Sequence, residues 1–169
     1  NQRTYVNEIA LIDLDINRVD GEVMDLNHCL AYSPSKITIK RGDYSDCKDA
    51  KIVVIAAGAN QNPGETRMDL INKNSKIFKG IIDEVMKNNF NGVFLIATNP
   101  VDIMTKVVQE VSKFPTNKVI GSGTALDTSR LRYQIGKYLD VSSKNIHAYV
   151  MGEHGDSSFV PWEHAYVGC

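Results

Sequence analysis

Cysteine is scarce in this sequence, and long apolar runs are absent. Its three cysteines, Cys29, Cys47 and Cys169, form an odd and widely spaced set among 169 residues. That pattern predicts neither a disulfide framework nor a metal site, so a reducing, cytoplasmic setting is expected. No apolar run approaches the roughly 20 residues of a membrane span, which argues against a membrane protein.

An excess of charge of one sign is also missing. The net charge is −1, and lysine and arginine are scattered along the chain, which argues against a nucleic-acid partner. The sequence has no G-x-S-x-G turn, no phosphate-binding GKS or GKT loop and no H-E-x-x-H pair. The usual signatures of three common enzyme classes are therefore missing. Histidines at 147, 154 and 164 fit no standard zinc spacing, and no metal is expected.

What the sequence does contain is an alternation of short apolar runs with helical patterns. Runs rich in Val and Ile predict strands at residues 8–13, 36–42, 50–58, 92–99, 118–122 and 146–152. Apolar residues that recur at steps of three and four predict helices at 69–88, 102–112 and 124–139. Strands that alternate with helices predict an α/β fold around a parallel sheet.

Polar residues follow several predicted strands, and each has a plain and a chemical interpretation. Asp13 either binds the ribose of a dinucleotide or caps a turn, and the twelve residues before it leave no room for the glycine-rich turn expected about 20 residues upstream. Arg67 is either a movable arginine at a ligand-binding sheet edge or a helix-start surface residue. Asn99 either faces a cleft or turns the chain. The segment 121–126, GSGTAL, is typical of a tight strand-to-helix turn.

Asp127, Arg130 and His154 also leave two interpretations open. Asp127 and Arg130 are three residues apart, so on a helix they share a face. In one interpretation they form a surface ion pair. In the other they have separate roles: Asp127 orients a histidine, and Arg130 binds a carboxylate. His154, in the segment MGEHGD, is either a base or a loop residue, because the glycines beside it favour turns.

Four motifs in order, AAGANQNPGETR, ATNPVDI, GSGTALDTSRLR and HAYVMGEHGD, resemble the lactate/malate dehydrogenase family over essentially the whole chain, and most closely its bacterial L-lactate dehydrogenases. The resemblance implies a Rossmann-like, doubly wound parallel sheet that lacks its first strand, followed by the start of the catalytic domain. Residues 1–123 would be an N-terminally truncated NAD-binding domain, and residues 124–169 a C-terminally truncated substrate domain. As a partial sequence, the chain alone is expected to be inactive and poorly folded.

The resemblance implies reversible, NAD-dependent oxidation of (S)-lactate to pyruvate, the last step of fermentative glycolysis. His154 would exchange a proton with the substrate. Asp127 would orient the ring of His154, and Arg67 would polarise the substrate carbonyl. Arg130 and Asn99 would bind the substrate. Gln61 would distinguish lactate from malate, because malate dehydrogenases have an arginine there that pairs with a second carboxylate. The alternatives are a malate or other 2-hydroxy acid dehydrogenase, or a non-catalytic binding protein.

Further contacts follow from the same resemblance. Arg132 and His147 match positions that bind fructose 1,6-bisphosphate across a subunit interface, which implies an allosterically activated homotetramer, although a structural role for both remains open. Gly80 departs from the family pattern, in which a small polar residue often stands there, so no NAD contact is assigned to it. The implied NAD contacts are Asp13, Arg18, Tyr44, Gly58, Ala59, Ala97, Thr98, Asn99 and Ser122.

Overall fold

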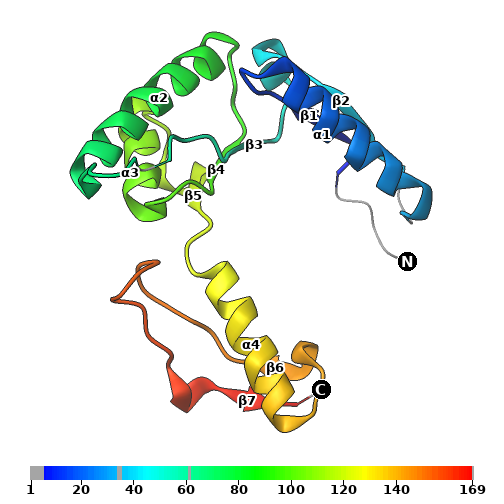
Figure 1. Ribbon diagram of the computed structural model, residues 1–169, viewed down its shortest axis with the longest axis vertical. Helices are drawn as coiled ribbons and strands as arrows, with labels where there is room; N and C mark the ends of the chain where they lie inside the picture. The colour runs from blue at the N-terminus through cyan, green and yellow to red at the C-terminus, as the bar shows by residue number, and fades with distance from the viewer. Residues whose placement is uncertain (1–5, 34–35, 61, 169) are drawn as a thin grey trace. The chain divides into compact units, whose positions relative to one another are not determined.

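The computed structural model describes residues 6–33, 36–60 and 62–168 as alternating strands and helices (Figure 1). Neighbouring strands run parallel in the three-stranded sheet and in one of the two two-stranded sheets, which confirms the predicted α/β class. The chain forms two compact units, residues 1–51 with 83–91, and residues 52–82 with 92–169. The predicted domain boundary between residues 123 and 124 stays a prediction.

The first unit is a strand–helix–strand segment. Strand β1 (Glu8–Leu11) pairs in parallel with β2 (Thr38–Arg41), and helix α1 (Ile16–Cys29) connects them. The carboxylate of Asp15 caps α1 by accepting from the backbone N–H of Arg18 at 3.1 Å. At the other end of the helix, the amide of Asn27 donates to the carbonyl of Ile39 at 3.0 Å, so α1 is tied to β2. A 3₁₀ helix follows α1 at Leu30–Tyr32, and another follows β2 at Tyr44–Lys48.

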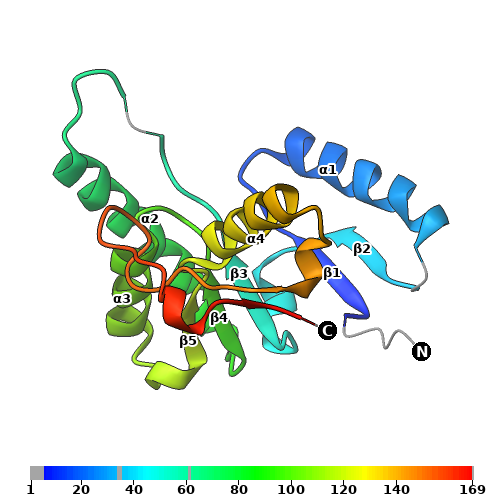
Figure 2. The same cartoon turned by 90° about the horizontal axis from the view of Figure 1, so that it is seen from below.

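The second unit contains a three-stranded parallel sheet in the order β3–β4–β5. Its strands are β3 (Ile52–Ile55), β4 (Val93–Ile96) and β5 (Val119–Gly121). Helix α2 (Arg67–Lys87), whose residues from 83 onward belong to the first unit, follows β3. Helix α3 (Val101–Ser112) follows β4 and packs against β4 and β5 (Figure 2). Phe94 and Ile96 on β4 are fully buried, and each such side chain contributes about 1.5–3 kcal/mol of transfer free energy. Further buried residues of this core are Phe78, Ile82, Met104 and Val108.

The C-terminal part of the second unit is built on helix α4 (Ala125–Leu139). The turn between β5 and α4 is tight and contains Gly123 at φ 49°, as predicted for the GSGTAL segment. Strands β6 (Ile146–His147) and β7 (Tyr166–Val167) pair antiparallel, and Met151 bridges Phe159 between them. Short 3₁₀ helices span Thr116–Lys118, Ser143–Asn145 and Trp162–His164.

The predicted elements differ from the structure mainly at their ends and in two omissions. Helix α1 and strand β7 were not predicted. The strand expected at 146–152 stops at His147, because Val150 bonds to threonine side chains of α4 instead of a neighbouring strand. Among the described residues, no helix combines the length and the apolar character needed to cross a membrane.

Candidate active site

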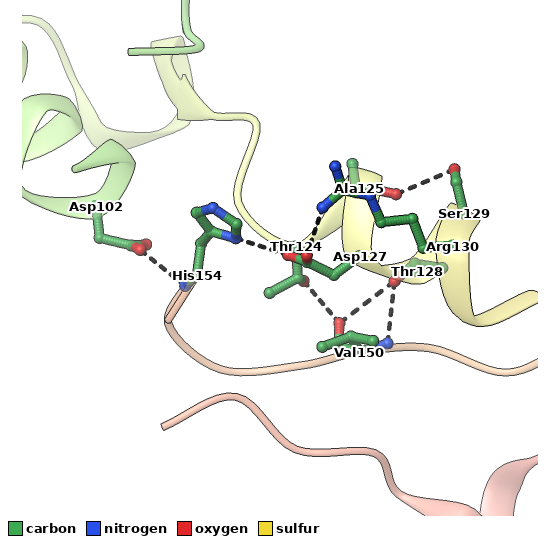
Figure 3. A network of polar contacts seen from close by, with 9 residues as sticks. All are labelled: Asp102, Thr124, Ala125, Asp127, Thr128, Ser129, Arg130, Val150 and His154. Carbon is green, nitrogen blue, oxygen red and sulfur yellow. Dashed lines mark hydrogen bonds and ion pairs between the residues drawn. The ribbon is translucent and has the colours of Figure 1, made fainter. Parts of the chain in front are cut away.

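The centre of the candidate site is a short contact between His154 and Asp127 (Figure 3). The imidazole Nδ1 lies 2.6 Å from the carboxylate Oδ2, and the two side chains are 30% and 25% exposed. A hydrogen bond of this length and partial burial holds the ring in one orientation. The residues come from segments 27 positions apart, so tertiary structure creates the pair.

Helix α4 fixes the position of Asp127 and also holds the segment that leads to His154. Asp127 lies in the first turn of α4, where the helix dipole favours a negative charge. The hydroxyl of Thr124 donates to the carbonyl of Val150 at 2.6 Å, and the backbone N–H of Val150 donates to the Thr128 hydroxyl oxygen at 3.0 Å (Figure 3). Both backbone polar groups of Val150 are therefore satisfied by α4.

A small loop then carries the histidine. Met151 and Phe159 close its base with two backbone hydrogen bonds of 2.8 and 2.9 Å. Gly152 has φ 93°, a conformation that favours glycine, and a Cβ there would lie 3.3 Å from the Ser157 carbonyl oxygen. The backbone N–H of His154 donates to Asp102 Oδ2 at 3.1 Å (Figure 3). Asp102 was not predicted as a site residue, although the motif ATNPVDI contains it.

Arg130 is the third charged residue beside this pair. Its Nη1 lies 3.8 Å from Asp127 Oδ1, so the two oxygens of Asp127 face different partners. The Arg130 side chain is 67% exposed, and a long contact with that exposure contributes at most about 1 kcal/mol. The structure thus contains both arrangements considered for Asp127, with the histidine contact the shorter. The exposed guanidinium remains able to bind a further anion.

The carboxyl ends of the parallel strands form a second group of candidate residues. The hydroxyl of Thr98 donates to the carbonyl of Ala57 at 2.7 Å, and a Cβ added to Gly58 would lie 2.9 Å from Thr98 Cγ2. Only glycine permits that approach of the β3 end to the β4 end. Ala97 and Asn99 are exposed on either side of the buried Thr98, and Ser122 donates through its backbone to Ile96 at 2.8 Å.

Asn74 supports this strand edge and was not singled out from the sequence. It is 1% exposed in helix α2, and its Oδ1 accepts from the backbone N–H of Ala59 at 2.8 Å. A buried amide that satisfies a loop N–H fixes the backbone just beyond β3. The signal available in the sequence was one polar residue close to the apolar stripe of the predicted helix.

Comparison with known proteins decides the family. The NAD-binding domain model of lactate/malate dehydrogenases matches residues 1–121, and the model of their alpha/beta C-terminal domain matches residues 124–169. The chain belongs to the lactate/malate dehydrogenase family. The resemblance noted in the sequence is therefore confirmed.

Several members of the lactate/malate dehydrogenase family align with nearly the whole chain. L-lactate dehydrogenase from Oceanobacillus iheyensis is 58% identical, covering 95% of this chain and 50% of the relative. The L-lactate dehydrogenase of Bacillus pumilus is 54% identical, covering 98% of this chain and 53% of the relative. A solved lactate dehydrogenase from a deep-sea metagenome superposes with TM-score 0.91 at 52% identity, covering 96% of this chain and 52% of the other. The solved structure of a minor L-lactate dehydrogenase from Enterococcus mundtii superposes with a TM-score of 0.90 at 42% identity. The match covers 96% of this chain and 52% of the other. The chain spans about half the length of the relatives it matches.

Three residues predicted from the family resemblance lie in the first unit. Asp13 is exposed just beyond β1, and its Oδ1 accepts from the Asp15 N–H at 3.0 Å. Arg18 is exposed in the first turn of α1. Tyr44 is half-buried, and burial raises the pKa of its hydroxyl.

Arg67, which the family resemblance makes catalytic, begins helix α2. The hydroxyl and backbone N–H of Thr66 donate to Asp69 Oδ2 at 2.6 and 3.1 Å, and the Asp69 N–H donates back to Thr66 Oγ1 at 3.1 Å. This capping box fixes where the helix begins and hence the backbone of Arg67. Gln61 lies outside the described residues.

Arg132 and His147, the candidate activator residues, lie on α4 and β6. Arg132 Nε donates to the carbonyl of Ala148 at 3.0 Å, and its guanidinium lies 4.6 Å from the centre of the Tyr149 ring. His147 stacks on Tyr166 with ring centres 4.5 Å apart. Within the part of the chain that the structure describes, no cluster of His, Cys, Asp or Glu could hold a metal ion.

Proposed function

We propose that the complete protein containing this chain is an NAD-dependent L-lactate dehydrogenase that interconverts (S)-lactate and pyruvate. The observation that carries the proposal is the 2.6 Å contact between His154 and Asp127. Its support comes from relatives more than half identical that bear this name. A histidine paired with a carboxylate is the arrangement needed to exchange one proton with a hydroxyl group.

The contact assigns separate tasks to the two imidazole nitrogens. Because an ionised carboxylate only accepts hydrogen bonds, the Nδ1 of His154 carries a hydrogen toward Asp127, and Nε2 is the atom that exchanges a proton. During lactate oxidation Nε2 takes the hydroxyl proton, and during pyruvate reduction it returns a proton to the carbonyl oxygen. Asp127 stabilises the imidazolium that forms. The chemistry that NAD would supply, when bound, is the hydride acceptor for lactate oxidation and, in its reduced form, the hydride donor for pyruvate reduction.

The remaining substrate contacts are assigned by chemistry and by the family resemblance. Arg130 binds the substrate carboxylate through its exposed guanidinium fork. Arg67 polarises the substrate carbonyl, and Asn99 holds the same oxygen. Gln61 leaves room for a methyl group and offers no charge to a second carboxylate, which favours lactate over malate.

Each unit, taken by itself, offers groups that suit part of a dinucleotide. Asp13 offers an exposed carboxylate to the ribose hydroxyls, and Arg18 and Tyr44 lie in the same unit. Gly58 has no side chain to obstruct a ligand at the end of β3, where parallel sheets bind nucleotides. The other residues proposed to bind NAD are Ala59, Ala97, Thr98, Asn99 and Ser122.

The wider setting belongs to the same proposal. The complete protein is a cytoplasmic homotetramer that acts in the last step of fermentative glycolysis. Fructose 1,6-bisphosphate activates it through Arg132 and His147, because an arginine and a histidine on neighbouring elements can both donate hydrogen bonds to a phosphate. Support comes from the bond of Arg132 to Ala148, the residue next to His147.

One assay tests the proposed activity. The purified complete protein is given NADH with pyruvate or oxaloacetate, and NADH absorbance is followed. We expect pyruvate to be reduced with the higher kcat/KM. Faster reduction of oxaloacetate would instead make the protein a malate dehydrogenase, and binding of NADH without reduction of either acid would make it a non-catalytic binding protein.

A further inference from the structure

We propose that Asp102 is a positioning residue, which holds His154 in its reactive place by binding the backbone rather than the ring. The inference rests on the proposed function, because it assigns a support to the proton-exchanging histidine. Asp102 is the second residue of helix α3, and its Oδ2 accepts from the His154 N–H at 3.1 Å. Figure 3 shows the two carboxylates, Asp102 and Asp127, on opposite sides of the histidine.

The loop needs such a support because its own sequence gives it little rigidity. Gly152 and Gly155 flank the histidine, and nothing lies within 4 Å of a Cβ added to Gly155. The other hydrogen bonds of the loop, Ser158 N–H to Gly155 and the Ser157 hydroxyl to Glu153, join loop residues to one another. Such bonds move with the loop and do not fix its place on the fold.

Two hydrogen bonds among the described residues connect the loop tip to the rest of the unit. Within the described residues, residues 152–158 reach other elements by hydrogen bonds only through the His154 backbone to α3 and the His154 ring to α4. The contact with Asp102 fixes the position of the His154 backbone, and the contact with Asp127 fixes the position of its ring. With the backbone held, the ring meets Asp127 without having to order the loop at each turnover, so less conformational entropy is lost during the reaction.

Asp102 also has a possible structural role that the test must separate from this one. A carboxylate in the first turn of α3 stabilises that helix through the helix dipole, whatever else it binds. Asp102→Asn and Asp102→Ala both remove the charge. Only Asp102→Asn keeps an oxygen that can accept from the His154 N–H. The pair of variants thus separates the acceptor from the charge.

The experiment uses the complete protein with these two variants and Glu110→Ala as a matched control. Glu110 is an exposed acid of the same helix that contacts Lys106 and Lys113. We expect Asp102→Ala to lower kcat for pyruvate reduction roughly 10- to 100-fold, the range associated with a small displacement of a reacting group. NADH affinity should stay the same, Asp102→Asn should retain kcat within about threefold, and Glu110→Ala should match the wild type. Equal losses in both Asp102 variants, or no loss in either, would overturn the proposal.

A second measurement needs neither turnover nor a variant. In the wild-type protein, hydrogen exchange of the His154 amide should be at least tenfold slower than that of the Gly155 amide. Equal exchange would overturn the proposal, even if Asp102→Ala failed to fold. If the wild type reduces neither keto acid while the His154 amide is protected, the proposed function fails and the positioning by Asp102 stands.

Discussion

Replacing Asp127 by asparagine removes the charge that faces His154 while nearly preserving the size of the side chain. The lost interaction is a 2.6 Å hydrogen bond between partners that are 30% and 25% exposed. A hydrogen bond to a charged group at such a site contributes about 2–3 kcal/mol. If that stabilisation is greatest when the imidazolium forms, kcat should fall roughly 30- to 150-fold.

The assay compares Asp127→Asn with Ser129→Ala in the complete protein. Ser129 lies on the same helix, is exposed and bonds only to the Ala125 carbonyl among the described contacts, so its variant should keep wild-type kcat. The contact of Asp127 with Arg130 is 3.8 Å long and exposed, so its loss should change the pyruvate KM much less than kcat changes. Retention of more than a third of wild-type kcat by a folded, NADH-binding Asp127→Asn protein would refute the assigned role.

Four further predictions concern the helices and strand ends around the site. The pKa of Asp69 is lowered, first by the hydroxyl of its capping partner and then by that partner's N–H, so the helix cap should be complete above the ordinary aspartate pKa of about 4 and be lost as pH falls through the lowered pKa. Carboxyl titration by NMR measures this, and Asp69→Asn should abolish it. Gly58→Ala should cost about 1–3 kcal/mol in the free energy of unfolding and weaken NADH binding. Gly80→Ala, in open space on helix α2, should stabilise by about 0.5–1 kcal/mol. Asn74→Ala should cost about 1–3 kcal/mol by leaving a loop N–H without its acceptor, whereas Asn72→Ala on the exposed face should change the free energy of unfolding by less than about 0.5 kcal/mol.

The long helices and the strands of the parallel sheets could be predicted from the sequence, because the apolar patterns that indicate them are local. The stripe that contains Phe78 and Ile82 repeats at helical steps, and the helix predicted there differs from α2 by two residues at its start and one at its end. The run that becomes β3 is apolar throughout, as expected for a strand covered on both faces, but Ile52 and Val54 are 57% and 58% exposed and only Ile55 is buried. The apolar run thus located the strand without showing which of its residues are covered.

Helix α1 shows where local signals were too weak. Its apolar positions, Ile16, Val19, Val23 and Leu26, do follow helical steps, and Asp15 is a good capping residue. Only Val19 is buried, and Gly21 interrupts the segment with a poor helix former. The tie between Asn27 and β2 cannot be foreseen from spacing, because it joins residues of different elements.

The candidate site divides in the same way. The placement of Asp127 and Arg130 on one helix face followed from their spacing, whereas the choice between an ion pair and a histidine partner needed the tertiary structure. Asp102 could not be chosen from the sequence, since nothing in ATNPVDI indicates a bond to a backbone 52 residues away. Roles that depend on contacts between distant segments are therefore the ones that sequence patterns leave open.

The glycines beside His154 illustrate why the plain and chemical interpretations were not in competition. Gly152 gives the loop a backbone that other residues adopt only with strain, and the histidine two residues later contacts Asp127. Freedom alone would spread the imidazole over many positions, at a cost in entropy on each ordering. The threonine bonds to Val150 and the Asp102 bond to the His154 backbone limit that spread from two sides. A glycine-containing loop thus places the proposed proton-exchanging histidine at one position, because helices hold both its base and its tip.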